Sequence, residues 1–347
     1  MPTSNQASRN TALDTLRTLS ILFVIAIHTA GRFLMPYAGY TKSVFLQGAV
    51  IESLVQWGVP LFVMLSGAFV LGGNDSVQKI YGKRLPKLFW PLLLWLPVNW
   101  LWVLLTGGSA KLVQLFLHGQ PFMHLWFMVM LIGLYLIIPL LNRLIKKAGH
   151  HPSVLYIFVL FFMFIAVIWR LYIYRTAPTD FNLYMHPLLF LQYTGYFLAG
   201  YVLRNYPLSA GRSSAGLYVL LMFAAWCFTF LMLLKQRGMT GNTPLYLLDN
   251  FSPGSVLGSI SLFSLMCHPR MRKMKKNILS GLHAEVMGIY LMHLIAINLL
   301  ERPLLEIFPQ LMNHPVVFTL VIVLGVTVLC FAGTRILRSM VFFRRFV

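Results

Sequence analysis

Ten apolar stretches of about 20 residues follow one another along this chain, with short polar loops between them. A stretch of that length is long enough to cross a bilayer as a helix. Lipid offers no hydrogen-bond partners, so each spanning segment must satisfy its own backbone groups. The sequence therefore predicts an all-α fold, a polytopic membrane helix bundle. The predicted spans are residues 13–35, 44–71, 86–106, 123–142, 153–173, 184–203, 214–234, 250–267, 278–300 and 314–336.

The composition excludes a soluble globular fold. Of the 347 residues, 58% are hydrophobic and 10% are charged, which is typical of a membrane protein. A net charge of +20 is also found in nucleic-acid-binding proteins, but here the basic residues fall between apolar runs. No nucleic acid partner is therefore expected. Neither an inserted soluble domain nor a long linker is present, so residues 1–347 are predicted to form one transmembrane domain.

The uneven distribution of Lys and Arg predicts the orientation of the bundle. Ten spans would put both termini on the same side of the membrane. If that side is the cytoplasm, 20 of the 28 Lys and Arg residues lie in cytoplasmic segments and eight lie outside. This excess fits the positive-inside rule, so both termini are expected in the cytoplasm. The polar start, residues 1–12, has no cleavage pattern, so the first span should be retained.

The first span carries three polar side chains that lipid would not tolerate: Asp14, Arg17 and His28. Steps of about 100° per residue place all three on one helix face. A rise of about 1.5 Å per residue separates Arg17 from His28 by roughly 16 Å along the axis. Arg17 is then near the cytoplasmic surface, paired with Asp14, and His28 lies in the outer half. An intramembrane ionisable residue is a functional-site candidate, although His28 could also be a hydrogen-bonded core residue.

Glu52 in the second span lies as far from the outer surface as His28, about seven residues in each span. It is expected either to orient and charge the imidazole of His28 or to face an aqueous funnel on the outer side. Pro60 should kink the span, and the pair Ser66-Gly67 permits close approach of a neighbouring helix.

Further candidates lie near both surfaces. Lys83, Arg84 and Lys87 either set the topology and contact anionic lipid or bind phosphate oxygens. His124 and Trp126 open the fourth span on the outer side, as an interfacial anchor or as a contact for a sugar. His293 in the ninth span is expected at the depth of His28, with Tyr290 one turn before it.

Sequence signals for other chemistries are missing. The chain has no HExxH, P-loop or Gly-rich nucleotide motif, so a metal enzyme or an ATP-driven pump has no support. The cysteines Cys227, Cys267 and Cys330 are isolated within apolar runs and are interpreted as packing residues.

Several of these segments resemble the acyltransferase-3 family of integral membrane acyltransferases. Arg17, ten residues and His28, with Asp14 just before, resemble its signature. Phe62 to Gly67 resembles its Phe-x-x-x-Ser-Gly segment, and Arg84-x-x-Lys87 resembles its Arg-x-x-Arg, with Lys in place of the second Arg. The run HLWF at 124–127 and the run from Tyr290 to His293 resemble two later elements. In length the chain is most similar to short, single-domain O-acetyltransferases of that family.

The resemblance implies a function and a set of site residues. The protein would move an acetyl or other short acyl group from cytoplasmic acetyl-CoA to a hydroxyl of a surface glycan or lipid-linked glycan precursor, in a bacterial inner (plasma) membrane. The implied catalytic residues are His28, Asp14 and Arg17. Glu52 is a fourth catalytic candidate because of its depth, and the resemblance does not assign it. The implied CoA-binding residues are Arg17, Lys83, Arg84, Lys87 and Ser66. The implied acceptor-binding residues are His124, Trp126, Tyr290 and His293. His28 would act as a general base or carry the acyl group covalently.

A different class of protein can use the same intramembrane polar residues. A proton-coupled transporter or a glycolipid flippase would line a path with Asp14, Arg17, His28 and Glu52. Many transporters consist of two related halves, and the first and second five predicted spans show no such correspondence. Dependence on acyl-CoA separates an enzyme from a carrier. Membrane lipids are expected partners, no metal is expected, and the sequence leaves both monomer and homo-oligomer open.

Overall fold

The computed structural model describes residues 10–34, 40–73, 75–107, 124–149, 151–176, 188–208, 211, 213–240 and 245–346. Every regular element within these residues is a helix, which confirms the predicted all-α class. The longer helices are α1 (Thr11–Ala30), α2 (Lys42–Val55), α3 (Gly58–Val70), α5 (Pro86–Leu105), α7 (Trp126–Leu136), α8 (Ile138–Ala148), α9 (Pro152–Thr176), α11 (Leu189–Asn205), α12 (Ser214–Thr240), α13 (Pro253–Cys267), α15 (Val286–Ile307) and α16 (Pro315–Ser339). The shorter elements are η1 (Gly31–Leu34), α4 (Val77–Lys79), η3 (Ile80–Arg84), η4 (Leu245–Leu248), η5 (Met271–Lys273), α14 (Ile278–Leu282), η6 (Pro309–Asn313) and η7 (Phe343–Arg345).

Among the described residues, seven helical segments are long and apolar enough to cross a membrane, and the bent pair α7–α8 makes an eighth if it is one span. The protein is therefore a multi-pass membrane protein. Two other predicted spans correspond to α11 and α13, which have 17 and 15 residues. At about 1.5 Å per residue, both are shorter than the hydrocarbon core of about 30 Å. Most of their residues are buried in the bundle. The count of ten spans stays a prediction.

Two of the predicted spans are interrupted at prolines. The span 123–142 divides at Ile137, where α7 and α8 meet at an angle of 50°. Pro139 explains this break, because proline fits the first turn of a helix but clashes with the carbonyl four residues earlier in a helix interior. The span 44–71 is interrupted between α2 and α3 at Gln56 and Trp57. Gln56 lies four residues before Pro60, where the same clash is expected.

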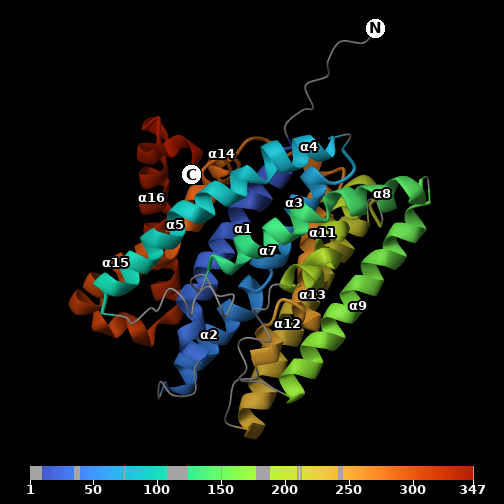
Figure 1. Cartoon of the computed structure of the whole chain (residues 1–347). Helices are drawn as coiled ribbons and strands as arrows, with labels where there is room; N and C mark the ends of the chain where they lie inside the picture. The colour runs from blue at the N-terminus through green and yellow to red at the C-terminus, as the bar shows by residue number, and fades with distance from the viewer. Residues whose placement is uncertain are drawn as a thin grey trace.

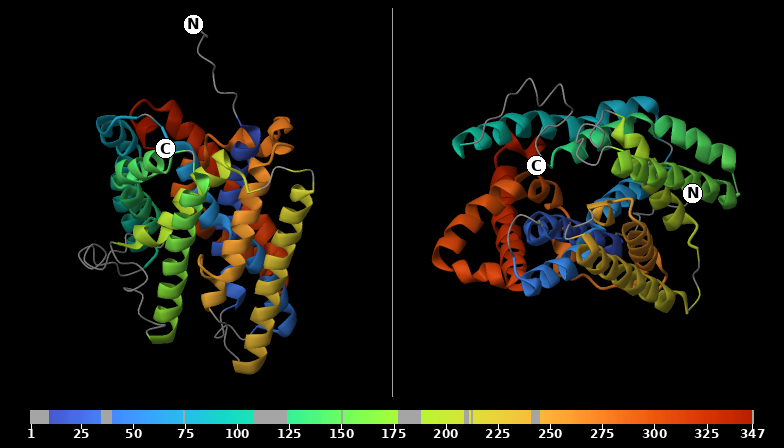
Figure 2. Two further views of the ribbon diagram at one scale, coloured as in Figure 1. Left: turned by 90° about the vertical axis from the view of Figure 1, so that its right-hand side faces the viewer. Right: turned by 90° about the horizontal axis from the view of Figure 1, so that it is seen from below.

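α1 lies at the centre of the bundle (Figure 1, Figure 2) and contacts α2, α3, α13, α14, α15 and α16. The side-chain oxygen of Asn10 caps the helix by accepting a hydrogen bond from the N–H of Leu13 at 3.3 Å. Asp14 in the first turn places a negative charge at the positive end of the helix dipole. The polar residues of α1 therefore face protein rather than lipid.

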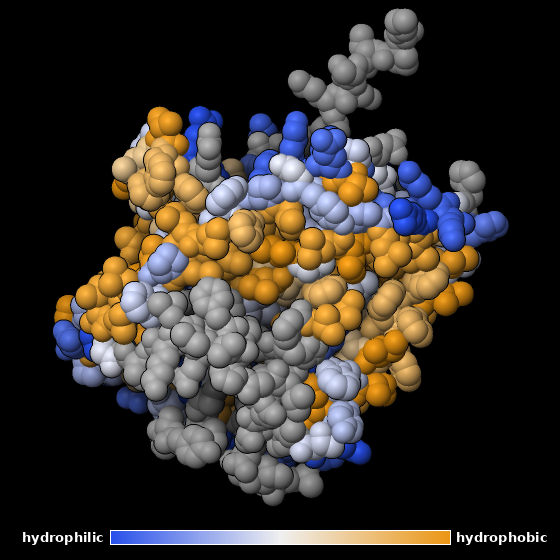
Figure 3. Space-filling view, viewed as in Figure 1, coloured by the Kyte–Doolittle hydropathy of each residue, from blue (hydrophilic) through white to orange (hydrophobic). Residues whose placement is uncertain are grey.

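The surface bears an apolar belt that meets a hydrophilic rim at the end of the bundle where α4 and α8 lie (Figure 3). The apolar windows of α9 and α12 are only 28% and 22% buried inside the protein. Helices that are apolar and exposed in this way contact lipid. The hydrophilic rim is the end of the bundle that the charge distribution predicts to be cytoplasmic.

α3 and α11 are in backbone contact. A Cβ atom built on Gly67 would lie 1.7 Å from the carbonyl oxygen of Phe197, and one built on Gly200 would lie 1.8 Å from that of Met64. Neither position can hold a larger residue without separating the helices. Small residues allow this kind of packing in membrane proteins, and the close approach predicted at Ser66-Gly67 is confirmed.

We expect that Gly67→Ala and Gly200→Ala each destabilise the bundle, because the added methyl group would overlap a carbonyl of the facing helix. Overpacking of a core contact costs about 1–3 kcal/mol, so the apparent melting temperature in detergent should fall clearly. Gly216→Ala in α12 is the matched control, since nothing lies within 4 Å of its Cβ position. Equal melting temperatures for the three variants would contradict the close packing.

Candidate active site

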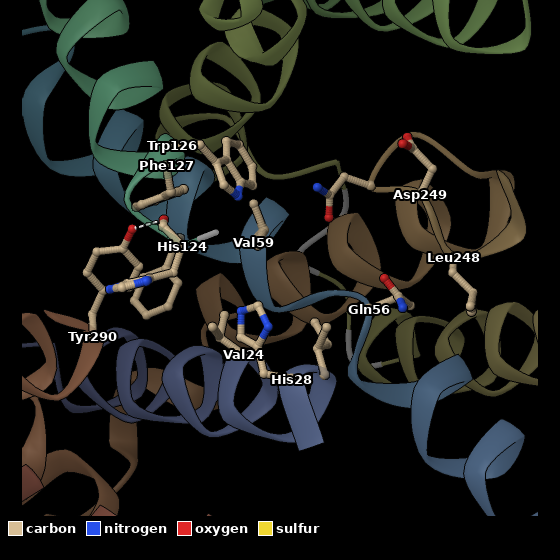
Figure 4. Close-up of a pocket in the computed structure, with 13 residues that line it drawn as sticks. Val24, His28, Gln56, Val59, His124, Trp126, Phe127, Leu248, Asp249 and Tyr290 are labelled. Carbon is tan, nitrogen blue, oxygen red and sulfur yellow. Dashed lines mark hydrogen bonds between the residues drawn. The ribbon is translucent and has the colours of Figure 1, made fainter. Parts of the chain in front are cut away.

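A cavity of about 220 Å³ lies beside His28 near the middle of the bundle (Figure 4). It is lined by Val24, Ile27, His28, Gln56, Val59, Phe62, His124, Trp126, Phe127, Leu248, Asp249, Asn250 and Tyr290. These residues come from α1, the break between α2 and α3, the first turns of α3, the turn before α7 and its start, the end of η4 with the segment after it, and α15. The wall includes no Lys or Arg among the described residues. A strongly anionic group therefore has no cation to pair with in this cavity.

Three histidines from three separate elements meet at the cavity. The ring centroids of His28 and His293 are 5.3 Å apart, and those of His124 and His293 are 5.1 Å apart. The predicted common depth of His28 and His293 is confirmed, and His124 joins them from the turn before α7.

Backbone carbonyls orient two of these rings. His124 Nε2 lies 3.3 Å from the oxygen of Leu291, and His293 Nδ1 lies 2.6 Å from that of Tyr290. A carbonyl only accepts, so these ring nitrogens carry the protons and the other two are left as acceptors. His124 Nδ1 and His293 Nε2 are buried without a partner. Because an unsatisfied buried polar atom is costly, both acceptors are suited to bind a proton donor.

Tyr290 stabilises the turn that carries His124. Its hydroxyl donates a hydrogen bond to the carbonyl of His124, and its ring packs edge-on against the His124 ring at 5.7 Å. Tyr290 lines the cavity, so its ring can still make the predicted contact with a substrate. Its hydroxyl proton is already donated to the turn of His124.

Glu52 reaches the cavity through Gln56. The Glu52 side chain is 1% exposed, and its Oε2 accepts a hydrogen bond from Gln56 Nε2 at 2.7 Å. Gln56 in turn lines the cavity beside His28. The described hydrogen bond of Glu52 therefore goes to Gln56. Of the two predicted alternatives, the pair with His28 does not appear among the described hydrogen bonds, and a side chain that is 1% exposed does not face an aqueous funnel.

The cations predicted to bind CoA lie at the hydrophilic end of the bundle. The guanidinium of Arg17 lies 5.2 Å from the Phe69 ring and within electrostatic range of Asp14. Arg204 covers the same ring at 4.7 Å and donates to the carbonyl of Ala68 at 2.6 Å. We call Arg17, Lys83, Arg84, Lys87 and Arg204 the basic end. Ser66 lies one residue before the α3–α11 contact and is half-buried.

Within the basic end, Arg84 pairs with Asp75, which also contacts Lys79 at 2.5 Å. Hydrogen bonds from Lys79 and Arg84 lower the pKa of Asp75, so this carboxylate is ionised at neutral pH and offsets part of the local positive charge. Lys83 and Lys87 are exposed. Among the predicted CoA-binding cations, Arg84 therefore shares its charge with Asp75, whereas Lys83 and Lys87 are exposed to a phosphate.

Three polar residues of the cavity wall, Gln56, Asp249 and Asn250, were missed by sequence reasoning. Gln56 follows Glu52 by one helical turn, and this spacing was a usable signal. Asp249 is one of only eight acidic residues in the chain. In a membrane protein, an acidic residue next to a span is a candidate for a functional site, and this was a second usable signal. Asn250 offered no such signal, because a polar residue at the first position of a predicted span is ordinarily a cap or a loop residue.

Comparison with known proteins agrees with the sequence resemblance. The family model described as Acyltransferase domain (Acyl_transf_3) matches residues 10–335. No curated protein and no solved structure gives a significant match. Because the family model covers nearly the whole chain, the protein belongs to the acyltransferase-3 family, and this membership supports membrane acyltransferase activity.

We predict that diethyl pyrocarbonate, which modifies imidazole nitrogens with a free lone pair, reacts with His28 faster than with His293. His28 lines the cavity, whereas His293 is 0% exposed. Peptide mass spectrometry over a time course measures both rates in one sample, and His28→Gln identifies the His28 peptide. If His293 is modified first, the cavity opens in a different place from the one described.

Proposed function

We propose that the protein is a membrane O-acyltransferase that moves an acetyl or other short acyl group from cytoplasmic acyl-CoA to a hydroxyl of a surface glycan or lipid-linked glycan precursor. Its place would be a bacterial inner membrane, with both termini in the cytoplasm. One observation carries this proposal: the described wall of the cavity beside His28 holds no Lys or Arg, whereas Arg17, part of the basic end, lies toward the other end of α1. A donor with a charged head and a neutral reactive tail fits this division.

The donor would bind with its head at the basic end. Phosphate oxygens of CoA are matched by Arg17, Arg84, Lys87 and Lys83, because guanidinium and ammonium groups form charge-assisted hydrogen bonds with phosphate. Arg17 and His28 are eleven residues apart on α1, which corresponds to roughly 16 Å. A pantetheine arm is long enough to cover that distance along α1 and past Ser66. The thioester would then reach the imidazole of His28.

The transfer itself needs one base and one acyl acceptor. In the general-base route, the His28 imidazole takes the proton of the acceptor hydroxyl while the hydroxyl oxygen attacks the thioester carbonyl. The new C–O bond forms, the C–S bond breaks, and the imidazolium returns its proton to the CoA thiolate. In the covalent route, a His28 nitrogen first displaces the thiolate and forms an acyl-imidazole. The acceptor hydroxyl then attacks the acyl carbon, the C–N bond breaks, and the freed imidazole takes the hydroxyl proton and passes it to the CoA thiolate.

His124 and His293 would assist either route without taking the acyl group. Each ring is held by a backbone carbonyl and leaves one buried nitrogen as an acceptor. Two neutral acceptors near His28 can accept a hydrogen bond from its N–H and so favour the imidazolium that forms during transfer. Such bonds are often longer in an unliganded site and shorten when substrate binds.

His28→Ala should abolish acetyl-CoA turnover by purified protein in nanodiscs, measured as CoA release with membrane extract supplying acceptors. Loss of a general base lowers the rate by about 10²–10⁴-fold. His314→Ala, at an exposed histidine outside the cavity, is the matched control and should keep wild-type turnover. A transporter or flippase would leave acetyl-CoA intact in every sample, so absence of turnover in the wild type would refute the proposal.

The basic end should recognise the phosphates of the donor and not its acyl group. We therefore expect Arg84→Gln and Lys87→Ala to raise KM for acetyl-CoA about tenfold, since a hydrogen bond to a charged group contributes about 1.5–3 kcal/mol. Neither variant should change KM for S-acetylpantetheine, which lacks those phosphates. Lys42→Ala, at the opposite end of the bundle, is the control. A rise in KM for both donors would show that the cations act on the fold instead.

A further inference from the structure

A polar wall lies across the cavity from His124 and Tyr290. Figure 4 shows Asp249 and Leu248 on one side of His28 and the His124–Tyr290 pair on the other. Asn250, the next residue in the chain, also lines the cavity. The wall belongs to the short segment between η4 and α13, and none of its residues takes part in the acyl transfer described above.

Buried groups of α9 and α11 hold this segment in place. Asp249 accepts a hydrogen bond from the N–H of Phe251 at 2.8 Å, and its other oxygen lies 3.7 Å from Arg170 Nε. Asn250 Nδ2 donates to the hydroxyl of Tyr193 at 2.8 Å, and its main-chain carbonyl accepts from Tyr196 at 2.5 Å. An arginine that is 6% exposed within a spanning helix is expensive and marks a functional element. Here it fixes a carboxylate at the cavity.

What remains for a ligand is a pair of amide groups and one carboxylate. The Asn250 amide uses one of its two N–H groups on Tyr193 and the Gln56 amide uses one on Glu52, so each keeps an oxygen acceptor and one N–H donor. Asp249 adds a carboxylate. Asp249 is paired with Arg170 at 3.7 Å, and the described wall contains no Lys or Arg, so a phosphate or carboxylate in the cavity would lie near the Asp249 carboxylate with no further cation in that wall. Sugar hydroxyls both donate and accept, so they can bind the two amides and the carboxylate.

The shape of the cavity limits the size of that group. Trp126, Phe127 and Phe62 supply aromatic faces, against which the C–H face of a sugar ring can pack. The cavity has a volume of about 220 Å³. Pockets that bind drug-sized ligands are larger, with volumes of about 300–1,000 Å³. One ring fits, and the remainder of a longer glycan would stay outside.

We propose that Asp249 and Asn250 form the acceptor subsite and that this subsite takes the neutral, hydroxyl-bearing face of a single sugar ring and rejects an anionic ring. Arg170 is a positioning residue for Asp249, and Tyr193 is one for Asn250. This inference rests on the proposed acyl transfer and deepens it by naming the chemical class of the acceptor at the point of reaction.

Saturation-transfer NMR on the full-length protein in nanodiscs tests the subsite without requiring activity. The ligands are the methyl β-glycosides of glucose, galactose and N-acetylglucosamine, with methyl β-D-glucuronide as the anionic match to glucose. We expect at least one neutral glycoside to bind at least tenfold more tightly than the glucuronide. Asn250→Leu should weaken that binding at least fivefold, whereas Asn298→Leu, outside this cavity, should not change it.

Asp249→Asn separates the subsite from a general loss of structure. This isosteric change keeps an acceptor for the N–H of Phe251 and removes the charge, so the preference for the neutral glycoside over the glucuronide should shrink. A merely destabilised protein would bind both more weakly and keep the preference. Failure of all neutral glycosides to bind the wild type, or equal binding of the glucuronide, would overturn the inference.

Acetyl-CoA turnover measured on the same samples distinguishes the two proposals. Turnover without glycoside binding overturns the subsite and leaves the acyltransferase. Glycoside binding that depends on Asp249 and Asn250, without any turnover, overturns the acyl transfer and leaves a sugar site in this cavity.

Discussion

The fold depends on one constraint: polar groups inside a membrane must be covered by protein. α1 carries three ionisable residues, and α2, α3, α13, α14, α15 and α16 all contact it. Lipid-facing helices such as α9 and α12 are almost entirely apolar on their outer sides. The bundle is thus arranged so that the polar face of α1 never meets hydrocarbon. The histidine cluster and the basic end are both consequences of that arrangement, because each lies where α1 needs polar neighbours.

The electrostatics along α1 divide the protein into two parts. At the basic end, guanidinium groups gather around the Phe69 ring and one carboxylate, Asp75, offsets some of their charge. At the cavity, Asp249 is the one carboxylate among the described wall residues, and it lies 3.7 Å from Arg170 Nε. A highly charged ligand and a neutral one can therefore bind at different depths of one bundle without interfering.

Much of this could be predicted from the sequence, and the limits have physical causes. Helical periodicity placed Asp14, Arg17 and His28 on one face, and span length placed His293 at the depth of His28, because both follow from regular helix geometry. Loop residues such as Asn250 obey no such period, and their position depends on contacts with Tyr193 and Tyr196 that only the folded chain provides.

Rotation about a helix axis was the other unpredictable quantity. Equal depth suggested that Glu52 meets His28, but depth does not fix which way a side chain points, and the carboxylate binds Gln56 one turn along its own helix. The roles assigned to the site residues remain predictions that the proposed variants test.

The backbone contact between α3 and α11 has a mechanical consequence. With Gly67 and Gly200 leaving no space between the two helices, neither can slide or rotate against the other. α3 supplies Val59 and Phe62 to the cavity, and α11 supplies the two tyrosines that hold Asn250. That half of the cavity is therefore a stiff frame. Any change of shape needed to admit a ligand or release a product must come from the rest of the wall, which α1, the turn of His124 and α15 form.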